Sequence, residues 1–227
     1  MRRFTAGLIA VVAWGLWLSP STAAAQGKFV IKPLAQRKVS ELPAGPLYWR
    51  IERFSSGLYG SGVDEHGNSV DDALDHAKAA AGPWSLVAEA AGDVWLFTLG
   101  PPGGSTVEGT KVAEVGPISR PAAKEYLLRI NDASGPPGSI TKAHSHPGSE
   151  AFYVLSGETS SITPRGVMRV AAGHASAGND AGTPMRVSSS GATELHSLVM
   201  FVVDADEPFS SPAKLDSTHA DAGKELK

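Results

Sequence analysis

The segment from Gly138 to Gly157 constrains the fold more than any other part of the sequence. It places His144 and His146 one residue apart in a run of β-type sequence, and Glu150 follows a short Pro-Gly-Ser turn. Side chains alternate between the two faces of a strand, so both imidazoles point to the same side, and the carboxylate can return from the next strand. The spacing therefore predicts two adjacent strands that bring these three side chains to one point.

Two imidazoles and one carboxylate can bind a divalent metal ion and leave coordination positions free, as in oxygen-activating iron sites and other open divalent sites. The residues do not select among manganese, iron, nickel, zinc and copper. The alternative is a metal-free core in which hydrogen bonds hold the histidine pair. Burying two imidazoles and a carboxylate without an ion or close partners would be costly. We therefore predict that His144, His146 and Glu150 bind a divalent ion.

The same segment resembles the first conserved motif of the cupin superfamily: Gly, five residues, His-x-His, three or four residues, Glu, six residues and Gly. Every fixed position of this motif is matched. The resemblance covers residues 125–204 and implies a double-stranded β-helix, or jelly-roll, with the ion deep in the barrel. It is also compatible with a homodimer, because cupin barrels commonly pair through their sheets.

The second cupin motif is incomplete in this chain. It normally gives a Pro-x-Gly turn and a histidine three residues after that glycine, whereas this chain has Asp180-Ala-Gly182 followed by Met185. A thioether is a soft, weak ligand that suits copper better than iron, manganese or nickel, and methionine is more often part of a core. We therefore expect three protein ligands plus waters. His196 would approach the ion only if its strand face points inward, and His174 lies in a Gly-rich loop.

Three functions stay open at this level. The first is an exported metal-dependent enzyme of the dioxygenase, isomerase or lyase type that acts on a small oxygen-rich substrate. The second is a non-catalytic or sensory module that holds a small molecule or a metal, favoured by the missing histidine and the absence of an acid/base partner. The third is a structural envelope protein with a relict site. No basic patch indicates nucleic-acid binding.

The first 25 residues resemble a secretory signal peptide. Arg2 and Arg3 precede an uncharged apolar stretch, and small residues at Ala23 and Ala25 suit signal peptidase. The stretch is shorter than the ~20 residues of a membrane-spanning helix. We therefore expect cleavage before Gln26 rather than an uncleaved anchor, and a periplasmic or secreted protein without a stable membrane span. The residues after the arginine pair do not complete the twin-arginine pattern, so general secretion is the expected route.

The remaining sequence predicts a mostly β fold with one short helix. The chain has 25 glycines, 16 prolines and no cysteine, so turns are frequent and disulfides are absent. A helix is predicted over residues 69–82, where two aspartates lie in the first turn and Gly-Pro ends an alanine-rich run. Strands are predicted over residues 47–54, 84–90, 93–99, 111–118, 125–131, 139–144, 150–157, 167–171, 185–188 and 194–204.

These elements divide the mature chain into three parts. Residues 26–124 form a β-rich N-terminal extension, residues 125–205 form the cupin barrel, and residues 206–227 form a tail, which we expect to fray from Ser210 onward. The extension has two interpretations: a degenerate second barrel half, or strands that extend the sheets of the single barrel. We expect the latter, because about four strands are credible there and a barrel needs more.

Overall fold

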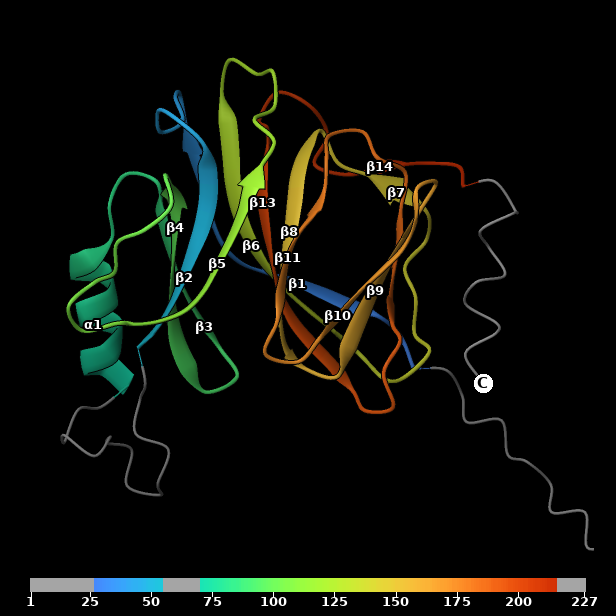
Figure 1. Cartoon of the computed structure of the whole chain (residues 1–227), viewed down its shortest axis with the longest axis horizontal. Helices are drawn as coiled ribbons and strands as arrows, with labels where there is room; N and C mark the ends of the chain where they lie inside the picture. The colour runs from blue at the N-terminus through green and yellow to red at the C-terminus, as the bar shows by residue number, and fades with distance from the viewer. Residues whose placement is uncertain (1–26, 55–69, 216–227) are drawn as a thin grey trace, which may run out of the picture.

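The computed structural model describes residues 27–54 and 70–215 (Figure 1). The expected leader, residues 1–25, and the last 12 residues of the expected tail lie outside the described residues. Among the helices of the described part, none is long and apolar enough to cross a bilayer.

The described chain is mostly β with one helix, as the sequence predicts. In chain order, the elements are β1 (Val30–Val39), β2 (Leu47–Phe54), α1 (Val70–Ala80), β3 (Ser85–Ala90), β4 (Asp93–Gly100), β5 (Thr110–Ile118), β6 (Tyr126–Gly135), β7 (His144–Ser145), β8 (Gly148–Ser156), β9 (Glu158–Thr163), β10 (Gly166–Ala171), β11 (Ala175–Asn179), β12 (Arg186–Ser189), β13 (Leu195–Asp204) and β14 (Ser211–Pro212). Every strand pair is antiparallel.

Two facing sheets form the barrel of the second half. One has five strands in the order β1-β6-β13-β8-β11, and the other has three strands in the order β10-β9-β12; the short pair β14-β7 closes one end. Side chains from both sheets meet in one apolar cluster, which includes Phe152 and Phe201 from the five-stranded sheet and Val187 from the three-stranded sheet. The predicted jelly-roll architecture is therefore confirmed.

Strand β13 contributes side chains to two hydrophobic cores, because successive side chains point to opposite faces of the sheet. Val199, Phe201 and Val203 point into the barrel and pack with its inner cluster. Leu198, Met200 and Val202 point the other way and pack against the N-terminal sheet. Because both faces of this strand are covered, its sequence is a continuous apolar run rather than an alternating one.

The N-terminal extension forms a sheet of its own. Strands β2 to β5 make a four-stranded antiparallel sheet in the order β3-β4-β2-β5, which packs through Trp49 and Phe97 on the outer face of the five-stranded sheet. Helix α1 covers its other face through Ala73 and Ala77. Figure 1 shows the resulting series of helix, N-terminal sheet and barrel side by side. None of the four strands predicted in this region joins the barrel's sheets; the strand of this region that does extend the five-stranded sheet, β1, was not predicted.

Several strands differ from their sequence predictions for identifiable reasons. Strand β9 has the sequence Glu-Thr-Ser-Ser-Ile-Thr and was not predicted, because serine and threonine are typical of loops. In the structure most of these hydroxyl side chains are buried, and β9 pairs with β10 and β12. Strand β1 was missed because it is an exposed edge interrupted by a bulge and lacks an apolar alternation. The strand predicted over residues 139–144 is wrong as a continuous element: isolated bridges at Ile140 and His144 and backbone hydrogen bonds of Ser139 and Thr141 connect this segment to its neighbours.

Candidate metal centre

The structure brings the three predicted ligand residues together. The candidate ligand atoms of His144, His146 and Glu150 all lie within 4.8 Å of one another. His144 is on β7, His146 follows in the turn and Glu150 is on β8. The two imidazole rings are 5.1 Å apart and nearly perpendicular. His146 and Glu150 are buried, whereas His144 is half-buried, so the group faces a site with one open side.

Backbone carbonyls set the tautomer of both histidines. Nδ1 of His144 lies 2.8 Å from the carbonyl oxygen of Lys142, and Nδ1 of His146 lies 2.6 Å from the carbonyl oxygen of Phe209. A carbonyl oxygen can only accept, so each Nδ1 carries the hydrogen and donates it. Both Nε2 atoms of the neutral rings therefore keep a free lone pair, which is the arrangement that orients histidine as a metal ligand.

Burial shifts the pKa values of Glu150 and His146. It raises the pKa of Glu150 to about 7, against the hydrogen bond from Asn179, which lowers it. It also lowers the pKa of His146 to about 4, and the nearby charges of His144 and Arg129 act in the same direction. The imidazole of His146 is therefore neutral near pH 7, while the carboxylate lacks a cationic partner.

The distance between His146 and Glu150 is compatible with a shared divalent ion. Nε2 of His146 lies 3.9 Å from Oε1 of Glu150, which is too far for a hydrogen bond. Two ligands that each lie about 2.0–2.2 Å from one ion can have this separation. An ion held by His144, His146 and Glu150 would neutralise the buried carboxylate and occupy the free lone pairs, so the donor set and the group match.

Asn179 holds the carboxylate of Glu150 and was not identified from the sequence. Its Nδ2 donates to Oε2 of Glu150 at 3.2 Å and to Oγ of Ser161 at 2.9 Å. Strand β11 places Asn179 directly across from Glu150. Gly178 makes this approach possible, because it has a φ of +68° and a Cβ at this position would overlap the carbonyl oxygen of Glu150. Asn179 therefore orients a candidate ligand.

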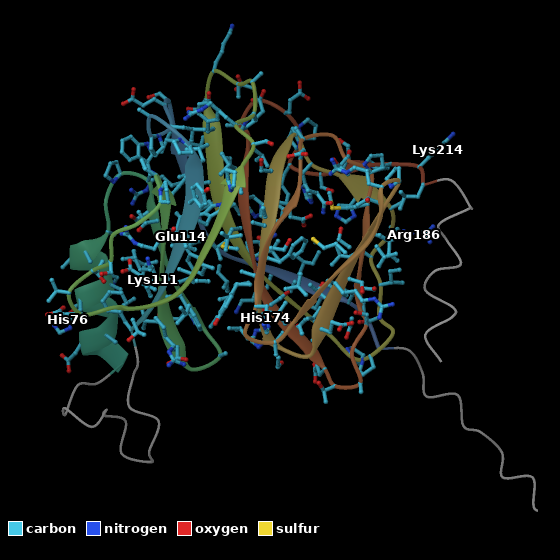
Figure 2. The ribbon with its side chains drawn as sticks, in the orientation of Figure 1. His76, Lys111, Glu114, His174, Arg186 and Lys214 are labelled. Carbon is cyan, nitrogen blue, oxygen red and sulfur yellow. The ribbon has the colours of Figure 1, made fainter. Side chains whose placement is uncertain are left out.

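The other candidates from the sequence do not join the three ligands. Met185 is buried in the barrel core beside the site, and its backbone forms a bridge with His144. His196 is on the outward face of β13, and its Nε2 lies 2.8 Å from Oδ1 of Asp132, so the option that it approaches the ion is wrong. His174 lies at the lower end of the barrel in Figure 2, whereas β7 lies at the upper end in the same orientation.

A cavity of about 280 Å³ opens beside the three ligands. Its walls are largely apolar, with Phe152, Val187 and Val199 from the two facing sheets. Lys142 is its only ionisable lining residue besides the three ligands among the described residues, and it is exposed. Arg186 follows Met185 in the chain, and its side chain lies on the outer side of the barrel in Figure 2.

The beginning of the expected tail is part of the site rather than a frayed end. The carbonyl oxygen of Phe209 accepts the hydrogen bond from Nδ1 of His146. The Phe209 ring lies 4.8 Å from the His146 ring and 4.9 Å from the Phe201 ring. Strand β14 pairs with β7, the strand that carries His144. The prediction of fraying from Ser210 is therefore wrong for residues 210–215, because backbone pairing and aromatic packing hold this segment against the ligands.

Solved structures with similar folds include cupins. A cupin-like protein from Thermotoga maritima is 14% identical, with a TM-score of 0.36 over 42% of this chain and 72% of that chain. A protein with a double-stranded β-helix domain from Klebsiella pneumoniae is 20% identical, with a TM-score of 0.32 over 39% of this chain and 76% of that chain. A DMSP lyase from Ruegeria pomeroyi is 20% identical, with a TM-score of 0.34 over 38% of this chain.

This chain spans less than half of the matched DMSP lyases, 44% and 43% of their lengths. No family model matches the sequence, and no curated protein matches it. The order of the strands and the position of the His-x-His and Glu residues on β7, its turn and β8 are features of this chain's own structure. The facing antiparallel sheets form a jelly-roll, which is the fold that the first motif implies.

Proposed function

We propose that this chain is an exported cupin that holds a divalent ion through His144, His146 and Glu150 and acts as a metal-dependent enzyme on a small oxygen-rich substrate. One observation carries the proposal: two free Nε2 lone pairs and a buried carboxylate converge within 4.8 Å beside a cavity of about 280 Å³. Three protein ligands leave positions on the ion for substrate oxygens.

In this proposal the ligand residues hold the ion and the apolar lining residues contact the substrate. The bound ion would supply Lewis-acid polarisation of a substrate oxygen. The two histidines and Glu150 hold the ion, and Asn179 keeps the carboxylate in place. Phe152 and Val199 exclude water and pack against the apolar part of a substrate. A small molecule is the expected partner, and the homodimer stays a prediction from the resemblance.

A non-catalytic binding or sensory module is the second candidate. It is favoured by the composition of the cavity, because Lys142 is the one described lining group besides the ligands that could transfer a proton. An enzyme in this fold would then depend on the ion and on Lys142 for its acid/base chemistry.

A turnover screen separates the two candidates. The mature protein would be loaded in turn with manganese, iron, nickel, zinc and copper and incubated with small hydroxy, oxo and carboxylic acids, with and without dioxygen. We expect product formation with the loaded wild type and at most background with His146→Ala. Ligand-dependent thermal stabilisation without product for any metal would contradict the enzyme and support the binding module.

We also predict export with cleavage before Gln26. The apolar stretch of the leader and the small residues before Gln26 support this prediction. Mass spectrometry of the protein recovered from the periplasm or medium of a bacterial host should give a chain that begins at Gln26. Recovery of the uncleaved chain in the membrane fraction would contradict it.

A further inference from the structure

Asn131 is a buried amide in the wall of the metal-site cavity. It is on β6, its exposed fraction is 2%, and it lines the cavity beside His144 and Glu150. Across the sheet it is paired with Val199, which is paired in turn with Phe152. Asn131 thus introduces a polar group into a row of the sheet that is otherwise apolar at these positions.

Arg129 determines which end of this amide faces the cavity. Nε of Arg129 donates to Oδ1 of Asn131 at 2.8 Å. A guanidinium can only donate, so the amide oxygen must be the acceptor and the NH2 group is directed away from Arg129. The side-chain hydrogen bond of Asn131 within the described residues is the one that Oδ1 accepts from Arg129, and Asn131 lines the cavity, where Nδ2 can donate to a bound molecule. An amide N–H in the wall of a cavity can donate to an acceptor oxygen of a bound molecule.

The position of Arg129 is itself restrained. Its guanidinium lies over the ring of Phe209, 4.1 Å from the ring centroid. Phe209 belongs to the C-terminal segment that also holds His146. Arg129 therefore connects the amide of Asn131 to the same segment that orients a metal ligand, and it acts as a positioning residue rather than as a contact for the substrate.

We propose that Asn131 selects substrates that carry a second acceptor oxygen in addition to the oxygen that binds the ion. This inference rests on the proposed metal site. Asn131 on β6 and Glu150 on β8 are separated by β13 and lie two residues apart in register, so their backbones are about 12 Å apart. A chain of a few carbons can span the gap between their converging side chains, and its apolar part packs on Phe152 and Val199. The substrate class is a short oxo acid or a comparable acyl compound.

Two nearly isosteric carboxylates test this proposal in the cobalt-loaded protein. Levulinate (4-oxopentanoate) has a carbonyl at the position where 4-methylpentanoate has a methyl branch, and acetate is the short reference. Binding is followed through the visible spectrum of cobalt. We expect the ratio of the Kd of 4-methylpentanoate to the Kd of levulinate to fall about tenfold in Asn131→Leu, because the donor is replaced by an apolar group of similar size. Asn131→Asp, which also lacks the NH2 group, should lower the ratio if Asn131→Leu does not fold.

Control variants separate this role from general damage to the cavity. Thr141→Ser keeps a hydroxyl in the same cavity and should leave the ratio unchanged. Arg129→Met should lower the ratio, and Arg129→Lys, which keeps a donor for Oδ1, should restore it. An unchanged ratio in a folded, cobalt-loaded Asn131 variant would overturn the inference and leave the metal site intact. A wild type that binds neither cobalt nor manganese, iron, nickel, zinc or copper would overturn both the proposed function and this inference.

Discussion

His146→Ala should lose more than about 100-fold in affinity for divalent metal, since loss of a hydrogen-bond partner of a metal ligand alone costs about 10–100-fold. His146 is the most constrained of the three candidates: it is buried, its Nδ1 is committed to the carbonyl of Phe209, and its Nε2 lies 3.9 Å from Glu150. Metal analysis and titration of the purified mature protein should give about one ion per chain for the wild type.

Variants of Met185 are the matched controls for this prediction. Met185 lies beside the site in the barrel core, and a thioether contributes little affinity for a hard ion. We expect Met185→Ala to bind metal almost as well as the wild type, although the cavity that it leaves costs about 2–5 kcal/mol of stability. Met185→His should bind more tightly, because it supplies a third imidazole as a fourth protein ligand.

Two results would contradict this account of the site. A wild type that stays metal-free after incubation with manganese, iron, nickel, copper and zinc would exclude a metal-dependent function. Loss of binding in a folded Met185→Ala variant would instead indicate a copper site with a thioether ligand.

The second large effect is expected from shortening the chain at its C-terminus. A chain that ends at Pro208 lacks the carbonyl of Phe209, the Phe209 ring and β14, which hold His146 and β7. We expect its metal affinity to fall about 10–100-fold, because the ring of His146 loses the acceptor that fixes its tautomer. Isothermal titration with zinc measures the loss.

A chain that ends at Leu215 is the control for this truncation. It keeps every described contact of the C-terminal segment, so its metal affinity should equal that of the full mature chain. Phe209→Ala in the full chain keeps the backbone carbonyl and removes only the ring, so it should lose less affinity than the chain ending at Pro208. Equal affinity of the Pro208 and Leu215 chains would show that Phe209 does not position His146.

The elements with strong local signals were predictable from the sequence. The helix predicted over residues 69–82 is α1 (Val70–Ala80), and the strand predicted over residues 47–54 is β2 (Leu47–Phe54). Both depend on periodicity and on stop signals within a dozen residues. Strand β9 lacks such a signal, because its serines and threonines are buried only after β10 and β12 pair with it.

The candidate ligands could also be predicted from the sequence, because their signal is local. His144, His146 and Glu150 are separated by at most six positions, so strand alternation and one turn determine that their side chains can meet. The group that completes the site comes from far along the chain: Asn179 is 29 positions from Glu150, and Phe209 is 63 positions from His146.

The sequence by itself determined the local geometry of the ligand motif, the β character of the chain and the one helix. Only the tertiary structure decided that His196 faces outward, that Asn131 lines the cavity and that Phe209 holds His146. The physical reason is that these features depend on the register between strands distant in sequence and on a backbone carbonyl, which every residue has and no sequence pattern distinguishes.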